Sequence, residues 1–478
     1  MKSRVAVIGA GPGGYMAAIR AAQLGAAVTV IEAEAVGGVC LNWGCIPTKA
    51  LRATAQALET ARRLAEFGVT GGGDCAVDLP AAMARKDRIV ADLVQAVERL
   101  LQSHGVDLLR GRARLTGPGR LAVEAEGGAG VVDYDRLIIA SGSRPLDLPG
   151  LARDGQSVLD ANDALALGQV PASLAVVGGG VVGCEFAFIY SALGAKVTII
   201  EASDRLLPLP SIDGDGAKVL LRECKKRGVA VKLGAMVQGA EAGPEGLVLR
   251  LTPSTLAERP IRGPETLVAE KAIVAVGRRP CAADLGLERV GVELDQRGAV
   301  AVGPTLATSA PNIWAIGDCL GTGRPMLAHM AGAEGRAAAA NALGAALRPD
   351  YDVVPAVVFT SPELASVGLS AEQAMQQGLE VNAQTFQMRQ LGKSQAMGQI
   401  AGHVKLLCAK KDGRLLGAHI VGPHAGDLIH ECALALRLGA TAADLAHAIH
   451  AHPTLAEGVQ EAAEMVLGQC LHAPPVRG

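Results

Sequence analysis

The sequence predicts an α/β fold with two βαβ nucleotide-binding domains, followed by an α+β domain at the C-terminus. Three observations carry this prediction. The chain has 478 residues, which is roughly three times the usual length of one domain. A pattern of apolar strand, glycine-rich turn, apolar helix and strand occurs twice in it. From residue 353 to the end, strand-like runs precede a long helical segment.

Composition restricts the possible partners. The 45 Lys and Arg residues nearly balance the 47 Asp and Glu residues, and the formal net charge is -2. Nucleic-acid binding needs a basic face, and the chain has no long Lys/Arg run. The first strand-like run starts at Val5 and breaks at Gly9, too short for the apolar core of a signal peptide, and no apolar run reaches the roughly 18 residues of a membrane span. We therefore expect a cytoplasmic protein that binds small molecules and proteins, without nucleic acid or membrane.

The repeat is a Rossmann-like βαβ unit. Residues 5–33 read VAVIGAGPGGYMAAIRAAQLGAAVTVIEA, and residues 174–202 read LAVVGGGVVGCEFAFIYSALGAKVTIIEA. Each copy opens with a buried parallel strand, passes through G-x-G-x-x-G into a helix, and ends in a β-branched strand closed by Glu. Two matches in the same register predict two dinucleotide sites.

The three glycines of each turn have separate tasks. The first allows a tight turn, the second lets the backbone approach a pyrophosphate, and the third lets the helix pack on the strand. They are Gly9, Gly11 and Gly14 in the first copy and Gly178, Gly180 and Gly183 in the second. Glu32 and Glu201 follow at the distance where a carboxylate binds a ribose 2′-hydroxyl and repels a 2′-phosphate, which favours NAD over NADP. Arg205 is an alternative phosphate ligand, although an arginine on a loop is usually only solvated.

Cys40 and Cys45 are the only closely spaced cysteines, and the other eight are scattered singly as buried apolar residues are. Five residues of regular helix rise about 7.5 Å, beyond the roughly 7 Å reach of a disulfide, so the pair can bridge only if the segment bends. Gly44 supplies that freedom. Thiolates near a helix N-terminus favour a disulfide that exchanges. A metal pair is the alternative, but no second Cys or His pair with zinc-like spacing accompanies it, so no metal is expected.

Residues 37–51, GGVCLNWGCIPTKAL, resemble the active-site signature of the pyridine nucleotide-disulfide oxidoreductases. Further motifs extend the resemblance over nearly the whole chain. It implies a homodimer that binds FAD and NAD, with an α+β dimer-interface domain at the C-terminus. The implied domains are an FAD-binding domain (1–145), an NAD-binding domain (146–272), a central domain that completes the FAD site (273–346) and the interface domain (347–478).

The resemblance also assigns cofactor-binding residues outside the glycine-rich turns. Apart from Ala113 and Val237, they come from the segments IIASGSRP, AVGRRP, TSAPNIWAIGD and MLAH. The carboxylate of Asp318, at the end of TSAPNIWAIGD, is expected to bind the ribityl chain. The assigned residues are Ala113, Ser141, Gly142, Ser143, Val237, Gly277, Asp318, Met326, Leu327, Ala328 and His329. The family more often has Thr at position 141 and Lys at position 330, where this chain has Ser141 and Met330.

Lys49 and Glu185 each open a helix, where either could be an ordinary surface charge. In the family the matching residues form an ion pair beside the reactive nitrogen of the flavin. We therefore expect Lys49 and Glu185 to pair at the cofactor site.

The C-terminal segment carries the acid–base candidate. A long helix is expected after Gly422–Pro423, with residues 450–457, HAHPTLAE, near its end. Pro453 keeps His452 out of helical geometry. The resemblance makes His452 the acid–base residue, reaching the disulfide of the other subunit, and Glu457 the residue that orients its imidazole. Glu457 could instead close a capping box with Thr454, and the two roles are not expected to be fully compatible in geometry.

The resemblance is strongest to the branch of the family that oxidises dihydrolipoamide carried on the acyltransferase of a 2-oxoacid dehydrogenase complex. It implies that the substrate attacks Cys40, that Cys45 passes electrons to FAD, and that NAD⁺ is reduced. A glutathione-reductase-like enzyme would favour a basic cluster where Glu201 stands. A mercuric-reductase-like enzyme has a second Cys pair near the C-terminus, where this chain has only Cys470. A catalytically silent scaffold subunit is a further alternative, but the chain retains Cys40 and Cys45.

Overall fold

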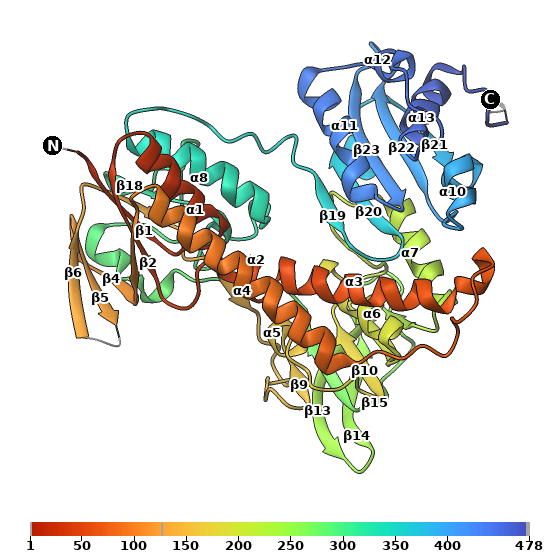
Figure 1. Ribbon diagram of the computed structural model, residues 1–478, viewed down its shortest axis with the longest axis horizontal. Helices are drawn as coiled ribbons and strands as arrows, with labels where there is room; N and C mark the ends of the chain where they lie inside the picture. Colours follow the sequence, from red (N-terminus) through yellow and green to blue (C-terminus); the bar gives the residue numbers. More distant parts are fainter. Residues whose placement is uncertain (1, 126–127, 475–478) are drawn as a thin grey trace.

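The computed structural model describes residues 2–125 and 128–474 (Figure 1). The first domain is built on a parallel sheet with the strand order β18-β7-β1-β2-β3. Its strands are β1 (Arg4–Ile8), β2 (Ala27–Glu32), β3 (Asp107–Arg110), β7 (Arg136–Ile139) and β18 (Ile313–Ala315). The apolar run from Val5 to Ile8 is buried, which places β1 in the middle of the sheet.

A helix from late in the chain completes the first domain. Helix α1 (Pro12–Gln23) packs against α8 (Ala328–Ala342), so the segment after residue 313 returns to the domain that residues 4–32 begin. A small antiparallel sheet lies beside β2 and consists of β4 (Arg112–Gly117), β5 (Arg120–Ala125) and β6 (Gly128–Asp133).

Three helices lie between β2 and β3 in the chain and connect the first domain with the second. They are α2 (Gly38–Asn42), α3 (Cys45–Arg62) and α4 (Leu79–Ser103), and α3 packs both on α4 and on α6 (Val181–Leu193) of the second domain. Figure 1 shows α3 and α4 as orange helices that cross the centre of the molecule. The predicted bend is present, because α2 ends before Gly44 and α3 begins at Cys45.

The second domain repeats the parallel arrangement, with the strand order β12-β11-β10-β16-β9. Its strands are β9 (Val158–Leu159), β10 (Ser173–Val177), β11 (Lys196–Glu201), β12 (Ala230–Leu233) and β16 (Lys271–Val274), and its other helices are α5 (Ala161–Ala164) and α7 (Gly214–Lys226). An antiparallel sheet of β13 (Ala235–Gly243), β14 (Gly246–Pro253) and β15 (Glu265–Ala269) flanks it. Because β16 pairs with β10 up to Val274, the parallel sheet extends slightly past the boundary predicted at residue 272.

The chain enters and leaves the second domain along one ladder. Strand β8 (Ser143–Pro145) pairs antiparallel with β17 (Arg278–Pro280). Short 3₁₀ turns follow, of which Gly317–Leu320 directly succeeds β18. No helix among the described residues has the length and apolar character needed to cross a membrane.

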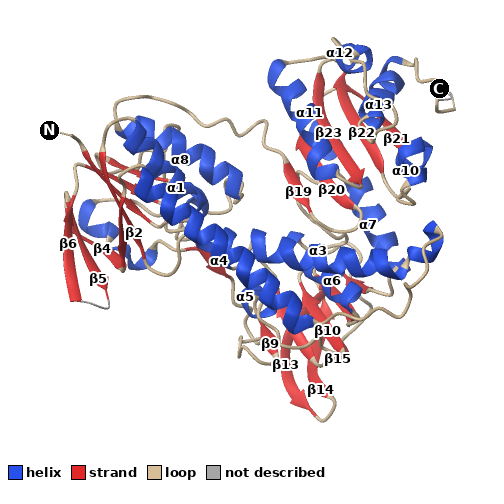
Figure 2. Ribbon diagram, viewed as in Figure 1, coloured by secondary structure: helices blue, strands red, loops and turns tan. Residues whose placement is uncertain are grey.

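The C-terminal domain is an antiparallel sheet with helices packed on it (Figure 2). The strand order is β19-β20-β23-β22-β21, and β22 is buried along its whole length. The strands are β19 (Ala356–Val358), β20 (Glu363–Gly368), β21 (Val381–Gln387), β22 (His403–Ala409) and β23 (Leu415–Gly422). The helices are α9 (Ala371–Gln376), α10 (Gly392–Ala396), α11 (Ala425–Leu438), α12 (Ala442–His447) and α13 (Glu457–Leu467).

The predicted position of residues 450–457 near the end of one long helix is wrong. Helix α11 ends at Leu438 because Gly439 adopts a left-handed conformation with φ of 67°. Thr441 then caps α12, and its hydroxyl accepts a hydrogen bond from the Asp444 N–H. His450 and His452 therefore lie in the connection between α12 and α13.

Candidate active site

The first glycine-rich turn closes around backbone atoms. Gly9 has φ of 98°, and a side chain there would start 2.3 Å from the Ala140 carbonyl oxygen. A Cβ at Gly14 would lie 1.9 Å from the Gly9 carbonyl oxygen. The buried Glu32 carboxylate accepts hydrogen bonds from the N–H of Ala10 at 2.6 Å and of Glu34 at 2.8 Å. Since a carboxylate has about four acceptor sites, Glu32 can still bind ribose hydroxyls.

The second glycine-rich turn has the same geometry. A Cβ at Gly178 would lie 2.5 Å from the Ala275 carbonyl oxygen, and one at Gly183 would lie 1.9 Å from the Gly178 carbonyl oxygen. The buried Glu201 accepts from the N–H of Gly179 at 2.6 Å and of Ser203 at 2.7 Å. The sequence repeat is therefore a repeat of hydrogen bonds as well, and both turns fit a dinucleotide.

Arg205 is not simply a solvated side chain. Its guanidinium donates to the carbonyl oxygens of Leu209 and Ile212, each at 3.1 Å. These bonds fold the side chain onto its own loop. Glu201 is thus the charged group of this loop that points at the glycine-rich turn.

Replacing Glu201 by Ala is expected to raise the KM for NAD⁺ about tenfold or more, because a hydrogen bond to a carboxylate contributes about 1.5–3 kcal/mol. The ratio of kcat/KM for NAD⁺ to that for NADP⁺ should also fall, because the carboxylate that repels a 2′-phosphate is gone. Steady-state kinetics with both coenzymes measure the two effects. Glu245→Ala, an exposed glutamate of the same domain, is the matched control. A wild-type protein that already prefers NADP⁺ would contradict the assignment of Glu201.

Cys40 and Cys45 lie on either side of the break between α2 and α3. Both are half-buried thiols, and Cys45 is the first residue of α3. A side chain at Gly44 would start 3.0 Å from the Val39 carbonyl oxygen, a tight contact, so the close return of the chain favours a glycine there. The Asn42 side-chain amide donates to the carbonyl oxygens of Val36 and Gly38 and stabilises the short helix.

The two sulfurs differ in acidity. A hydrogen bond from the Cys40 thiol lowers the pKa of Cys45 to about 7, against the opposing effect of burial and with the help of the Lys49 charge. The same hydrogen bond raises the pKa of Cys40. In the reduced pair the thiolate is therefore carried by Cys45 and the proton by Cys40.

The structure brings Lys49 and Glu185 together. The Lys49 Nζ atom lies 2.8 Å and 3.1 Å from the two carboxylate oxygens of Glu185, which is buried on α6. Phe359, which follows β19, completes the contact. Its N–H donates to Glu185 Oε1 at 3.0 Å, and its ring centroid lies 4.3 Å from Lys49 Nζ. Sequence analysis did not identify Phe359, because no pattern links it to Glu185 across 174 residues.

Asp318 lies where the first sheet meets the ladder of β8 and β17. The Ser143 hydroxyl donates to Asp318 Oδ2 at 2.6 Å, and Arg278 Nε donates to the Ser143 hydroxyl at 2.7 Å. Burial lowers the pKa of Arg278. The Ser141 hydroxyl is buried and has no hydrogen-bond partner within the described part of the chain. A flavin nucleotide would offer that partner, so these residues fit FAD.

The other assigned residues lie around these strands. Ala113 is buried in β4 next to β2, and Val237 is buried in β13 next to β11, so each neighbours a strand that ends in one of the two buried glutamates, Glu32 or Glu201. Gly142 and Gly277 have φ of 71° and 130°. Met326 precedes Leu327, the N-cap of α8, and Ala328 and His329 form the first turn of that helix. His329 Nε2 lies 2.9 Å from the Pro355 carbonyl oxygen.

Glu457 contacts His452, but the capping box that it could close with Thr454 is not formed, because the N-cap of α13 is Ala456 and the Thr454 hydroxyl donates to the Ala451 carbonyl oxygen. The Oε1 atom of Glu457 lies 2.8 Å from His452 Nδ1, and its Oε2 atom accepts from the Thr454 N–H at 2.8 Å. Burial opposes ionisation, but the hydrogen bonds from His452 and Thr454 hold the pKa of Glu457 below its ordinary value. The carboxylate thus holds the imidazole of His452 and the backbone of Thr454 at the start of α13.

Within one chain, His452 lies away from Cys40 and Cys45. Its side chain is 77% exposed, and the adjacent α13 packs on α12, β21 and β22 of its own domain. Figure 1 shows α12 and α13 at the end of the C-terminal domain that is remote from α2. Exposed apolar side chains lie on α11 and before His452: Leu434, Leu438 and Ile449. A second chain could cover this apolar surface and receive the imidazole.

Comparison with known proteins agrees with this arrangement. Residues 3–335 match the family model described as pyridine nucleotide-disulphide oxidoreductase, and residues 354–463 match its dimerisation domain. The chain is 40% identical to dihydrolipoyl dehydrogenase of Geobacillus stearothermophilus, over 99% of this chain and 98% of the relative. It is 42% identical to that of Thermus scotoductus, over 98% of each chain.

Two solved structures have the same fold. LpdA from Mycobacterium tuberculosis superposes with a TM-score of 0.88 and 30% identity, covering 97% of this chain and 99% of the other. The flavoprotein disulfide reductase RclA from Escherichia coli, in its Cu(II) complex, superposes with a TM-score of 0.85 and 27% identity, covering 98% and 100%.

Proposed function

The chain belongs to the pyridine nucleotide-disulphide oxidoreductase family, and from this premise we propose that it is a dihydrolipoyl dehydrogenase, which oxidises dihydrolipoamide and reduces NAD⁺. The observation that carries the proposal is the Cys40–Cys45 pair at the break between α2 and α3, in which the pKa of Cys45 is lowered and that of Cys40 is raised. The cofactors are FAD and NAD.

We assign FAD to the first glycine-rich turn and Glu32, together with Ser141, Ser143 and Asp318. We assign NAD to the second turn and Glu201. Bound FAD would accept an electron pair from the dithiol and deliver it as hydride to NAD⁺. The Lys49–Glu185 pair would lie where these two sites meet, because Lys49 comes from the FAD-binding domain and Glu185 from the NAD-binding domain.

The exchange steps follow from the chain's own groups. His452 accepts a proton from one thiol of dihydrolipoamide, and the resulting thiolate attacks the Cys40 sulfur and breaks the Cys40–Cys45 disulfide. Cys45 leaves as a thiolate, which Lys49 and the start of α3 stabilise. The second substrate thiol then attacks the substrate sulfur of the mixed disulfide, which closes the lipoamide ring and breaks the bond to Cys40. The released Cys40 sulfur takes up the proton that the second thiol loses. Glu457 keeps His452 Nδ1 occupied, so that Nε2 is free for the proton transfer.

The protein is a homodimer, in agreement with its dimerisation domain. We propose further that His452 serves the Cys40–Cys45 pair of the partner subunit, which its exposure in one chain supports. We also propose that the substrate is carried on the acyltransferase of a 2-oxoacid dehydrogenase complex in the cytoplasm. We propose the domain boundaries 1–145, 146–272, 273–346 and 347–478. Strand β16 of the NAD-binding sheet crosses the second of these boundaries and ends at Val274.

A steady-state comparison of substrates tests the proposal. The purified protein should be yellow, hold about one FAD per chain, and reduce NAD⁺ with dihydrolipoamide. It should be a poor catalyst of NADPH oxidation by glutathione disulfide or mercuric ion, since Glu201 disfavours NADPH. A folded protein that stays colourless after incubation with FAD would contradict the proposal, and so would a preference for glutathione disulfide.

A further inference from the structure

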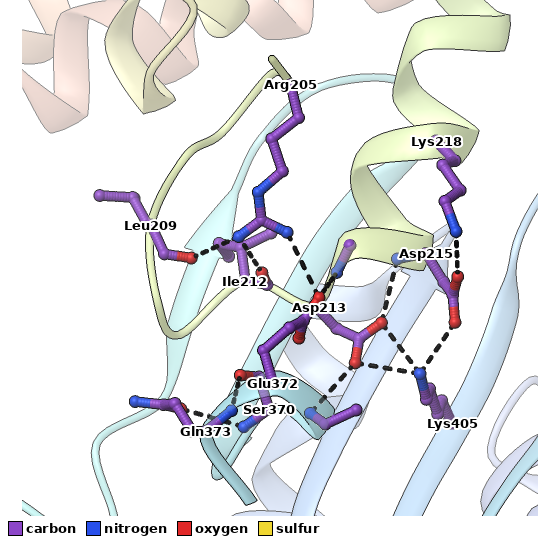
Figure 3. A network of polar contacts seen from close by, with 12 residues as sticks. Arg205, Leu209, Ile212, Asp213, Asp215, Lys218, Ser370, Glu372, Gln373 and Lys405 are labelled. Carbon is purple, nitrogen blue, oxygen red and sulfur yellow. Dashed lines mark hydrogen bonds and ion pairs between the residues drawn. The ribbon is translucent and has the colours of Figure 1, made fainter. Parts of the chain in front are cut away.

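A buried charge network joins the NAD-binding domain to the C-terminal domain (Figure 3). Lys405 on β22 is only 7% exposed, and its Nζ atom lies 3.0 Å from both carboxylate oxygens of Asp213 and 2.8 Å from Asp215. Asp213 is 3% exposed. A lysine and an aspartate this deeply buried require each other, because either one alone would be an uncompensated charge.

Asp213 acts on both domains at once. Its Oδ1 atom accepts the Asp215 N–H at 3.0 Å and so caps α7 of the NAD-binding domain. Its Oδ2 atom accepts the Ala371 N–H, at 3.4 Å, from the start of α9 in the C-terminal domain. The carboxylate is therefore a fixed point shared by the two domains.

Glu372 makes a second link from the C-terminal domain. Its Oε1 atom accepts the Gly214 N–H at 3.1 Å and lies 3.7 Å from the Arg205 guanidinium. Arg205 in turn holds the carbonyl oxygens of Leu209 and Ile212 (Figure 3). The C-terminal domain thus contacts the loop 202–212 through Arg205 and holds its far end through Asp213 and Gly214.

The loop 202–212 is also attached to the glycine-rich turn of the NAD site. It begins directly after Glu201, whose carboxylate accepts the Ser203 N–H. The Leu207 N–H donates to the Gly179 carbonyl oxygen at 2.8 Å, and the Leu206 side chain lies against Gly179. A shift of this loop would therefore move both the turn for the pyrophosphate and the carboxylate for the ribose.

We infer that Lys405 and Glu372 of the C-terminal domain are positioning residues for NAD⁺, which hold the loop 202–212 in the geometry that the coenzyme requires. The inference rests on the proposed function of the second glycine-rich turn as the NAD site. Neither residue contacts the reacting sulfurs. Their effect reaches the coenzyme through Asp213, Arg205 and the loop, and it makes NAD⁺ binding depend on the domain that also carries His452.

The inference is tested with Lys405→Met and Glu372→Ala in the FAD-loaded dimer. A mutation in a contact network that joins two sites changes the coupling free energy between them by about 0.5–2 kcal/mol. We therefore expect the KM for NAD⁺ to rise about two- to thirtyfold, while the KM for dihydrolipoamide stays unchanged. Hydrogen exchange gives a second readout, in which the Leu207 amide should exchange faster than in the wild type.

Asp412→Ala is the matched control, since it removes an exposed ion pair with Arg414 in the same domain but away from the loop. Lys405→Met leaves Asp213 unpaired, and if that variant does not fold, the exposed Glu372 decides the question. An unchanged KM for NAD⁺ in Glu372→Ala, or an equal rise in Asp412→Ala, would overturn the inference. A wild-type protein that does not use NAD⁺ would instead refute the proposed function itself, which the same assay shows.

Discussion

Replacing Cys40 by Ser is expected to lower the rate of dihydrolipoamide-dependent NAD⁺ reduction by at least about a thousandfold, because a hydroxyl group cannot form the mixed disulfide with the substrate. Cys45→Ser should be equally inactive, since no disulfide is then available for attack. Steady-state formation of NADH measures both losses. Cys75→Ser, at a half-buried cysteine outside the site, should keep wild-type activity.

The two inactive variants should differ in their spectra. Cys40→Ser removes the thiol that lowers the pKa of Cys45 but puts a hydroxyl donor in its place and keeps the Lys49 charge. Cys45 is therefore expected to remain a thiolate beside the proposed flavin site and to give a long-wavelength absorbance shoulder. The shoulder should disappear as the pH falls through the pKa of Cys45, because the thiolate is then protonated. Cys45→Ser should lack it at every pH. Identical spectra would mean that the roles assigned to the two cysteines are not distinct.

Replacing His452 by Gln is expected to lower the same rate by about 10²–10⁴-fold, the usual contribution of a general acid–base residue. The reason is that dihydrolipoamide then loses the group that accepts its thiol proton. FAD content and thermal stability should change little, because the side chain is exposed and its partner Glu457 still accepts the Thr454 N–H. His447→Gln, at an exposed histidine at the end of α12, is the control.

Mixed dimers show whether His452 acts on its own chain or on the partner. A Cys40→Ser chain and a His452→Gln chain, each carrying a different tag, are expressed together and the mixed dimer is purified by both tags. If His452 serves the partner subunit, one site is intact and the other has both lesions, so the activity should be about half that of the wild type. A mixed dimer as inactive as its parents would exclude the shared site.

The parts of the site that follow from local sequence were predictable. The spacing of Gly9, Gly11 and Gly14 is dictated by backbone contacts within one βαβ unit, and the second copy repeats it. The bend between Cys40 and Cys45 likewise follows from the rise of a helix and the reach of a disulfide. These constraints act over a few residues, so the sequence expresses them directly.

Contacts between distant segments were not predictable from one sequence. Lys405 and Asp213 are 192 residues apart, and neither stands in a pattern that marks a buried ion pair. The capture of Arg205 by Leu209 and Ile212 depends on a loop conformation that no motif specifies. The first contact forms only when two domains dock, and the second only when the loop has folded.

Glu457 shows a different limit. The capping box and the acid–base pair were each recognisable as a pattern, but only the contact with His452 forms, because the Thr454 hydroxyl turns to the Ala451 carbonyl oxygen and the helix begins after Ala456. The break after Leu438 was also missed, although Gly439 is a common signal for the end of a helix.

The most direct test of the account is a single-turnover labelling experiment on the oxidised, FAD-loaded dimer. Free thiols are first blocked by alkylation, dihydrolipoamide is added without oxygen, and newly exposed thiols are trapped with a heavy alkylating reagent and located by mass spectrometry. The account predicts heavy label on Cys40 and Cys45 alone, and no such label when NAD⁺ is added in excess and the electrons leave as NADH. Formation of NADH with Cys40 and Cys45 unlabelled under every condition would contradict the claim that electrons pass through this pair.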